Sequence, residues 1–380
     1  MNLVLCNRTN VLSLEQIDNT YAVAHPACTP QNLLEENLFV TPVEFKIDPK
    51  TIWQMPGEEV VKLVRSGYFA NSSGKIRFYA PSFMYYKTGY FRSSPAAFPS
   101  ISITGRFCAL KCKHCDGKVL NTMMPAVTPE QLVNLCTQLK QKGAKGCLIS
   151  GGCLPDGSVP LGKFIDAIAE VKRDLGLTVV VHTGVIELSM ARRLKEARTD
   201  AALIDIIGSD ETIKEIYQLN VEVQDFDRSL KALHESGIPF VPHVLVGLHY
   251  GKLKGEFRAL QMISKYEPSA VIVIALMPIH GTPMENVSPP TSTDIAKVLA
   301  MARLMMPNTP LVLGCMRPKG NSKGEIDVLA VDAGVNAIAF PADEAIKQAE
   351  SLGLEISFSS LCCSQIYEDI QRNLGNLQLP

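Results

Sequence analysis

Eight short apolar segments recur along residues 99–345 of this 380-residue chain, and helix-like segments separate them every ~25–35 residues. Most are rich in β-branched residues and lack polar alternation, as expected of strands buried on both faces. They are residues 100–104, 146–150, 178–182, 201–207, 240–246, 270–277, 310–315 and 337–340. The helix-like segments are residues 129–141, 162–174, 188–196, 229–236, 255–265, 293–305, 323–332 and 342–351. Thr128 followed by Pro129 is typical of a helix N-cap.

This alternation predicts an α/β fold, namely a (β/α)8 TIM-type barrel with an N-terminal extension and a C-terminal cysteine-bearing tail. A doubly wound open sheet is the competing architecture, but such sheets seldom contain eight regular repeats. We expect the extension at residues 1–95, the barrel at 96–353 and the tail at 354–380. Strand-like runs also occur at residues 75–80 (KIRFYA) and 354–360 (LEISFSS). The active site of a barrel lies at the carboxyl ends of its strands.

The charge balance narrows the possible functions. The chain has 37 Lys and Arg against 38 Asp and Glu, a formal net charge of −1. A neutral chain without a long basic run is a poor candidate for binding nucleic acid or an anionic membrane. Apolar residues make up 46% of the chain, which excludes general disorder. We see no long apolar span and no secretory signal at the start, so we expect a cytoplasmic protein.

The strongest chemical motif is a C-x3-C-x2-C triplet made of Cys108, Cys112 and Cys115, directly after the first predicted strand. A structural zinc site is the alternative interpretation, but it needs four protein ligands and no fourth ligand beyond His114 is evident nearby. Three thiolates in one loop leave one iron of a 4Fe–4S cluster without a protein ligand. The triplet therefore indicates an iron–sulfur cluster with a reactive open iron.

This spacing and placement resemble the radical S-adenosylmethionine superfamily. The resemblance implies that Cys108, Cys112 and Cys115 hold the catalytic 4Fe–4S cluster and that S-adenosylmethionine chelates its open iron. The reduced cluster then cleaves S-adenosylmethionine to a 5′-deoxyadenosyl radical, which removes hydrogen from an unactivated carbon. His114 matches the position that packs near the adenine.

Residues at other strand ends match further cofactor contacts of that superfamily. Gly151 and Gly152 stand where a Gly-Gly-Glu motif approaches the methionyl amine, with Cys153 in place of the Glu. Asp205 is a candidate ribose ligand, and a hydrogen-bonded polar residue of the barrel is the alternative. The remaining candidates are Thr183, Gly247 and Met277.

Cysteines outside the triplet suggest a second cluster. Cys153, Cys315, Cys362 and Cys363 are expected to converge over the barrel mouth and bind an auxiliary 4Fe–4S cluster, with buried core thiols as the alternative. Arg317 stands at the strand end where biotin synthase bears an arginine beside its auxiliary cluster. Cys6 and Cys28 are weaker candidates, and we interpret Cys136 and Cys147 as core residues.

The motifs SITGRFCALKCKHCDGKVLNTM, ISGGC, GCMRPKG and SFSSLCCS together resemble the two-protein lipoyl synthases of archaea and some bacteria. That resemblance implies sulfur insertion at C6 or C8 of an octanoyl chain, with the auxiliary cluster as sulfur donor. It implies an octanoylated lipoyl carrier protein or domain, a paralogous radical subunit and a reductant such as ferredoxin or flavodoxin as partners. The aromatic segment 78–91 is a candidate lining or lid for the acyl chain.

Other functions remain open at this stage. A biotin-synthase-like or cofactor-maturation enzyme acting on a small molecule shares the same motifs. A tRNA-modifying radical enzyme is disfavoured by the neutral charge and by the absence of a visible RNA-binding segment. A non-catalytic metal-binding scaffold is the remote alternative.

Overall fold

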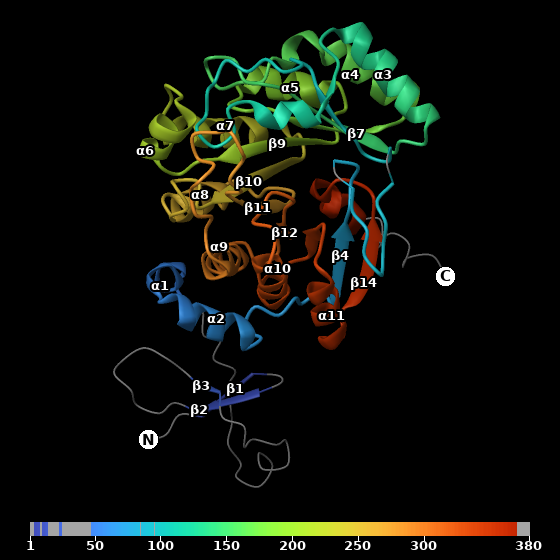
Figure 1. Ribbon diagram of the computed structural model, residues 1–380. Helices are drawn as coiled ribbons and strands as arrows, with labels where there is room; N and C mark the ends of the chain where they lie inside the picture. Colours follow the sequence, from blue (N-terminus) through green and yellow to red (C-terminus); the bar gives the residue numbers. More distant parts are fainter. Residues whose placement is uncertain are drawn as a thin grey trace. The chain divides into compact units, whose positions relative to one another are not determined.

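The computed structural model describes residues 4–7, 10–13, 23–24, 47–83, 85–94 and 96–370. The chain divides into two units, Met1–Thr51 and Ile52–Pro380. In the first unit, β1 (Val4–Asn7), β2 (Asn10–Ser13) and β3 (Val23–Ala24) form an antiparallel sheet. Helix α1 (Pro49–Gln54) crosses the boundary, and the second unit contains the other described strands (Figure 1).

The second unit is built on a curled sheet of eleven described strands, all of which run parallel to their neighbours. In spatial order they are β14 (Glu355–Ser359), β4 (Lys75–Tyr79), β13 (Ala337–Ala339), β12 (Leu311–Leu313), β11 (Val271–Ala275), β10 (Phe240–Val246), β9 (Ala201–Ile206), β8 (Thr178–His182), β7 (Gly146–Ser150), β5 (Ser100–Ser102) and β6 (Met124–Pro125).

The predicted α/β fold is confirmed, because each of the eight predicted strands contains an observed one, β5 and β7 to β13. The sheet nevertheless differs from a ring of eight strands. Strand β4 pairs with β13, opposing Phe78 to Ile338, and β14 pairs with β4 in turn. Within the described part of the chain, β14 and β6 are the two edges of the sheet.

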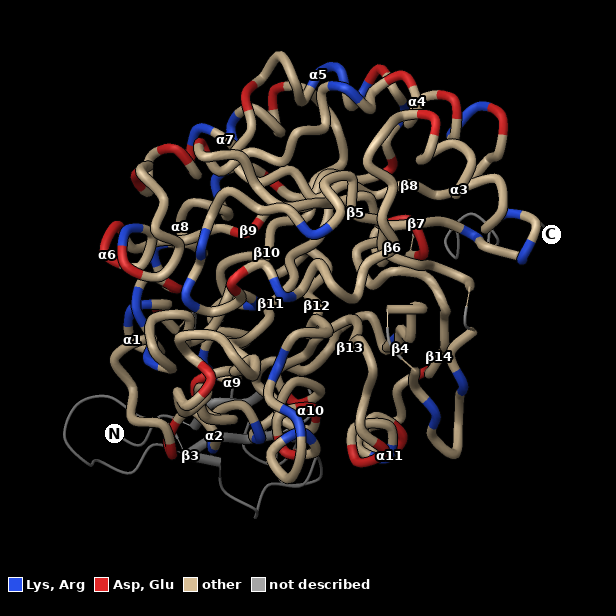
Figure 2. The backbone as a smooth tube through the Cα atoms, turned by 45° about the horizontal axis from the view of Figure 1, so that its top comes forward, with Lys and Arg blue, Asp and Glu red and all other residues tan. Residues whose placement is uncertain are grey.

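Apart from α2 (Gly57–Arg65), which no predicted segment covers, the helices below follow the predicted segments. They are α3 (Pro129–Gln141), α4 (Ile165–Glu170), α5 (Leu188–Glu196), α7 (Val223–Ser236), α8 (Glu256–Ile263), α9 (Ser292–Met305), α10 (Ser322–Asp332) and α11 (Asp343–Ser351). The predicted N-cap is confirmed, since the Thr128 side chain accepts a hydrogen bond from the Gln131 N–H at 3.2 Å. Charged residues concentrate on outer helices such as α3, α4, α5 and α7, whereas the strands are largely uncharged (Figure 2). None of the described helices is long and apolar enough to cross a membrane.

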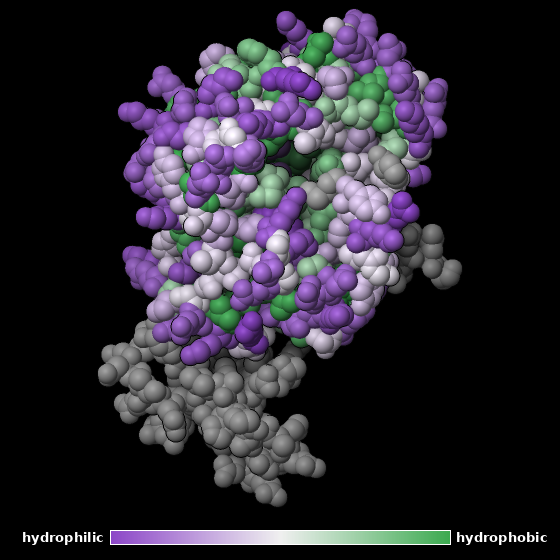
Figure 3. Space-filling view, viewed as in Figure 1, coloured by the Kyte–Doolittle hydropathy of each residue, from purple (hydrophilic) through white to green (hydrophobic). Residues whose placement is uncertain are grey.

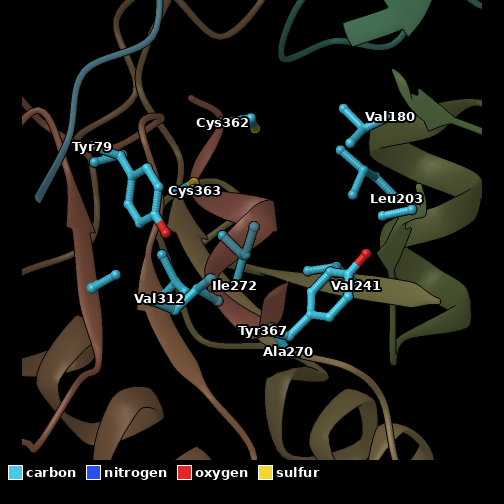
Figure 4. Close-up of a cluster of buried hydrophobic side chains, with 14 of the residues drawn as sticks. Tyr79, Val180, Leu203, Val241, Ala270, Ile272, Val312, Cys362, Cys363 and Tyr367 are labelled. Carbon is cyan, nitrogen blue, oxygen red and sulfur yellow. The ribbon is translucent and has the colours of Figure 1, made fainter. Parts of the chain in front are cut away.

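The segment after β14 fills the interior of the curl. Cys362, Cys363 and Ile366 are buried among apolar side chains of the strands, including Val180 and Leu203. Figure 4 shows the two cysteines between Tyr79 of β4 on one side and Val180 and Leu203 on the other. Burial of one such aliphatic side chain stabilises the fold by about 1.5–3 kcal/mol. The tail therefore completes the core of the open sheet.

Polar contacts join this tail to β4 and to the residue before β9. Asp369 accepts a hydrogen bond from the Tyr79 hydroxyl at 2.6 Å and forms an ion pair with Arg77 at 2.8 Å. The Tyr367 hydroxyl donates to the carbonyl of Asp200, just before β9, at 2.5 Å. Burial and the charge of Asp369 raise the pKa of Tyr79, so its hydroxyl stays protonated as a donor.

The aromatic segment 78–91 packs near β14 and β13, and Met84 lies outside the described residues. Phe91 stacks on Phe358 of β14 with ring centroids 5.3 Å apart, and the Tyr86 ring lies 5.7 Å from Phe340. These contacts place the segment against β14 and against the residue that follows β13. The expected role in lining an acyl channel stays a prediction.

Arg317, after β12, is fully engaged in the structure. Its side chain is 2% exposed and forms two hydrogen bonds to the carboxylate of Asp327, which is 0% exposed. Its other donors reach the carbonyls of Gly314, Ala339 and Phe340 at 2.6–3.1 Å. All five donors of the guanidinium are therefore used. The charge of Arg317 also opposes the rise that burial causes in the pKa of Cys315, and the role of Arg317 beside an auxiliary cluster stays a prediction.

Glu256, the first residue of α8, supports the end of β10. Its Oε1 accepts the Gly247 N–H at 2.9 Å, whereas Oε2 is buried without a hydrogen-bond partner. Burial raises the pKa of Glu256 from its ordinary 4.5 to about 7, so the folded chain retains this proton near neutral pH.

We predict that Asp327→Ala lowers the free energy of unfolding by about 3–5 kcal/mol, because it leaves Arg317 charged and unpaired in the core. Arg258→Ala is the matched control, since its partner Asp210 and Arg258 itself are about half exposed, and such surface pairs contribute about 0–1 kcal/mol. Urea unfolding measures both. Equal effects of the two substitutions would contradict the structural role of Arg317.

We also predict a pH-dependent contribution from Glu256. Its raised pKa means that the stability it contributes is full below about pH 4.5 and is lost as pH rises through about 7. Glu256→Gln removes the titrating group. We therefore expect the difference in free energy of unfolding between the wild type and this variant to fall by about 3 kcal/mol from about pH 5 to about pH 9. Urea unfolding across this range measures it, and parallel curves for the two proteins would exclude a raised pKa.

Candidate active site

The predicted triplet lies in the loop that follows β5, and backbone hydrogen bonds tie this loop to its neighbours. The Ala109 N–H donates to the carbonyl of Cys153, after β7, at 2.8 Å. The Lys113 N–H donates to the carbonyl of Ile216 at 2.8 Å, in the π-helical turn η5 (Ile213–Tyr217) that follows α6 (Asp210–Thr212). Three strand–helix connections thus hold the three cysteines at the carboxyl ends of the strands.

Gly152 lies against the first cysteine of the triplet. A Cβ at this position would lie 2.1 Å from the Phe107 carbonyl oxygen and 2.5 Å from the Cys108 Cα, so no side chain fits. The Gly152 N–H donates to Thr104 Oγ1 at 2.7 Å, and that hydroxyl donates to the Phe107 carbonyl at the same distance. Gly152 is therefore required by close packing against the triplet loop, and Thr104 is a supporting residue that the sequence did not single out.

The thiols of the triplet influence one another electrostatically. The hydrogen bond from Cys112 lowers the pKa of Cys115, and the same bond together with burial raises the pKa of Cys112. The ligand atoms of Cys112, His114 and Cys115 all lie within 4.8 Å of one another. Cys108 is not in that group, but its charge also raises the pKa of Cys112. Thiolate sulfur is the ligand that iron–sulfur clusters require, and three cysteines in this loop fit a 4Fe–4S cluster with one uncovered iron.

His114 faces Tyr217, the last residue of η5, with ring centroids 5.2 Å apart. Its Nδ1 is buried without a hydrogen-bond partner, which leaves a polar atom free beside the triplet. The carbonyl of Tyr217 also lies 3.4 Å from the Cys112 thiol. Sequence reasoning missed Tyr217, because apolar periodicity does not reveal a π-helical turn, although such turns are frequent at functional sites.

The other predicted cofactor residues differ in how far they are exposed to a bound cofactor. Thr183 is 2% exposed, and its hydroxyl donates to the carbonyls of Gly184 and Leu203 at 2.9 and 3.3 Å. Gly247 has a φ of +71° and abuts Pro290, which leaves no space for a side chain. Gly151 follows β7 and Met277 follows β11, both half-buried at strand ends.

Asp205 lies inside the curl between two histidines. Its Oδ1 is 3.4 Å from Nε2 of His182, and the rings of His182 and His243 are 5.7 Å apart. Burial is the largest single influence and raises the pKa of Asp205. The charge of His182 and its long hydrogen bond to the carboxylate, together with the charges of His243 and His114, outweigh burial and lower this pKa to about 2. Burial lowers the pKa of His243 to about 4. His243 was not among the predicted site residues, since a single histidine in an apolar strand gives no signal of its own.

The four cysteines expected to form a second site occupy two places. Cys153 lies beside the triplet, where burial and the charge of Cys108 raise its pKa to about 12. Cys315 packs against the interior cluster that contains Cys362 and Cys363. The hydrogen bond from Cys363 lowers the pKa of Cys362 to about 7. The structure therefore groups Cys315, Cys362 and Cys363, and Cys153 is not among the residues of that cluster. The convergence of all four cysteines on one auxiliary cluster stays a prediction.

The remaining cysteines are either core residues or lie outside the described part of the chain. Cys136 and Cys147 are both fully buried, which agrees with their interpretation as core residues. Cys28 lies outside the described residues, as does the side chain of Cys6.

Comparison with known protein families and structures agrees with this geometry. The model of the radical SAM superfamily matches residues 102–252, and the biotin and thiamin synthesis associated domain matches residues 273–359. Among solved structures, methylornithine synthase superposes with a TM-score of 0.53 at 15% identity, covering 86% of this chain and 95% of that one. The hydrogenase maturase HydG from Carboxydothermus hydrogenoformans gives 0.55 at 14% identity, covering 84% and 77%. These structures support the fold alone.

Curated relatives identify the family more narrowly than the solved structures do. Biotin synthase from Vesicomyosocius okutanii is 30% identical over 239 residues, which span 62% of this chain and 71% of the relative. Biotin synthase from Hyphomonas neptunium is 26% identical over 252 residues, which span 63% and 75%. The family matches begin at the strand before the triplet and extend through β14. On this evidence the chain belongs to the radical S-adenosylmethionine superfamily, with biotin synthases among its relatives.

Proposed function

We propose that this protein is a radical S-adenosylmethionine enzyme that inserts sulfur at an unactivated aliphatic carbon, on a small molecule as in biotin synthesis. The observation that carries the proposal is that one chain holds two groups of cysteines. They are the triplet with Cys153 beside it at the carboxyl ends of the strands, and Cys315, Cys362 and Cys363 in the interior of the curled sheet. Radical generation requires the first group, and a protein-borne sulfur source requires the second. The relationship to biotin synthases supports this assignment.

The chain's own residues would perform distinct tasks. Cys108, Cys112 and Cys115 would hold a 4Fe–4S cluster, which supplies the electron that cleaves S-adenosylmethionine to methionine and a 5′-deoxyadenosyl radical. His114 and Tyr217 would provide a ring surface beside the cofactor. The apolar strands and the tail would keep water away from the radical.

Cys315, Cys362 and Cys363 would hold an auxiliary iron–sulfur cluster, which supplies the sulfide that replaces the abstracted hydrogen. Their surroundings are apolar, because they pack among Val180, Val241 and Ile272 in the interior cluster. Figure 3 shows a hollow in the upper half of this face of the molecule, with apolar residues inside it and more polar residues on its rim. An aliphatic substrate matches such a lining.

A second candidate is sulfur insertion into a protein-bound octanoyl chain, as in two-protein lipoyl synthesis. Exposed apolar side chains next to the triplet favour it. Phe107 is 64% exposed and Val127 49%, and further apolar side chains from the same loops are Val119, Met124 and Leu154. An apolar rim at the site entrance suits the surface of a carrier protein. A paralogous radical subunit and a ferredoxin or flavodoxin reductant belong to this candidate.

The substrate is tested by incubating the reconstituted protein, reductant and S-adenosylmethionine with either dethiobiotin or an octanoylated carrier domain. Mass gain from sulfur in the small molecule supports the first candidate, and sulfur on the acyl chain supports the second. Zinc without iron or acid-labile sulfide in an anaerobic preparation would instead indicate a non-catalytic metal-binding scaffold.

Replacement of a triplet cysteine should abolish radical generation. We expect Cys112→Ala to eliminate 5′-deoxyadenosine formation, because the cluster loses one of three protein ligands. Cys136→Ala is the matched control, since Cys136 is also buried but belongs to α3 and interacts with Cys147. Chromatography of the nucleoside products measures both. Normal 5′-deoxyadenosine yield from Cys112→Ala would reject the assignment of the triplet.

Replacement of Cys315 or Cys362 should stop sulfur transfer without stopping the cleavage of S-adenosylmethionine. We expect Cys362→Ala and Cys315→Ala to retain 5′-deoxyadenosine formation and to lose sulfur insertion. Iron should fall from about eight to about four per chain after anaerobic reconstitution. Unchanged iron in either variant would show that the replaced cysteine is not a cluster ligand.

A further inference from the structure

A second group of potential metal ligands lies inside the curl, on three adjacent strands. His182, Asp205 and His243 belong to β8, β9 and β10, and His243 is the direct register partner of Asp205. In each strand the residue lies two positions beyond an apolar residue of the interior cluster, namely Val180, Leu203 and Val241. Side chains two positions apart share a face of a strand, so all three ligands project into the interior just beyond the apolar layer.

The distance between His182 and Asp205 in this group matches that between two ligands of one metal ion. His182 Nε2 and Asp205 Oδ1 are 3.4 Å apart, beyond the usual range of about 2.7–3.2 Å for an N–H···O bond. Two ligands of a tetrahedral zinc ion with bonds of about 2.0–2.1 Å are separated by about 3.3–3.4 Å. The ligand atoms of all three residues lie within 4.8 Å of one another.

The polar atoms of the group are also incompletely satisfied. Nδ1 of His243 is buried and has no hydrogen-bond partner. The side chains of His182 and Asp205 remain 25% and 28% exposed, so a ligand in the interior reaches them. A buried nitrogen without a partner is costly, and a bound cation would remove that cost.

A third group with similar composition provides a contrast. Glu211, Glu215 and His249 also lie within 4.8 Å of one another. Their polar atoms are already used, because Lys254 pairs with Glu211, the Tyr250 hydroxyl donates to Glu215 at 2.7 Å, and His249 contacts Thr212. This group is a saturated surface network and serves as an internal control.

We propose that His182, Asp205 and His243 together bind one divalent transition-metal ion, such as zinc, with a coordination position left open to the interior. Two histidines and one carboxylate are a common ligand set for such ions. The open position accepts an oxygen or nitrogen donor from a molecule bound in the interior. The site shares no ligand with the triplet or with Cys315, Cys362 and Cys363, but it uses Asp205, which is also the candidate ribose ligand.

The test uses full-length protein with its iron–sulfur content reconstituted anaerobically. Zinc chloride is added, unbound metal is removed, and retained zinc is measured by mass spectrometry together with zinc-edge X-ray absorption. We expect about one zinc per chain with only nitrogen and oxygen ligands at about 2.0–2.1 Å. His182→Ala, His243→Ala and Asp205→Asn should each lose this zinc, whereas His249→Ala should retain it.

Three outcomes would overturn the proposal. They are wild-type protein that retains no zinc, a zinc spectrum dominated by sulfur at about 2.3 Å, and variants that retain as much zinc as wild type. Iron content and circular dichroism verify that each variant is folded. The nearly isosteric Asp205→Asn variant decides the matter if a histidine variant fails to fold. Zinc retention in the Cys112→Ala protein separates this site from the proposed function, because radical chemistry is lost there while these ligands remain.

Discussion

The curled sheet depends on the segment that follows it, because parallel strands left open on one side do not bury their own inner face. Cys362, Cys363, Ile366 and Tyr367 occupy that interior, and Asp369 binds the segment to Arg77 and Tyr79. The sheet encloses the interior, and the side chains of the tail pack inside it. Since the same few residues also carry two of the three interior thiols, the core and the second candidate cluster site form together.

Close packing at one glycine sets the position of the triplet. The backbone of the β5 loop approaches Gly152 so closely that a single methyl group is excluded, and Thr104 joins the two segments by hydrogen bonds. The cysteines are therefore placed by backbone contacts between neighbouring loops, and their geometry does not rely on flexible side chains. This rigidity suits a site that must bind a cluster while leaving one iron uncovered.

Much of this arrangement could be predicted from sequence, because buried parallel strands leave continuous apolar segments and the triplet has a rare spacing. Strands β7, β8 and β10 and helices α3 and α5 agree with the predicted ranges residue for residue. Tertiary features could not be predicted. The pairing of β4 with β13 and the packing of Cys315 against Cys362 and Cys363 depend on contacts between distant segments. His243 and Tyr217 carry no local pattern and emerge only when neighbouring strands are placed together.

The docking of the tail also has a kinetic consequence. Tyr79 and Asp369 are separated by 290 positions in the chain, and Tyr367 and Asp200 by 167. Contacts between such distant residues form slowly, because the entropy of closing a long loop is lost before the contacts stabilise it. During synthesis every strand of the sheet leaves the ribosome before residues 362–369 do. The growing chain thus exposes an apolar interior until this segment arrives, and this interval is when chaperone binding and aggregation compete with folding.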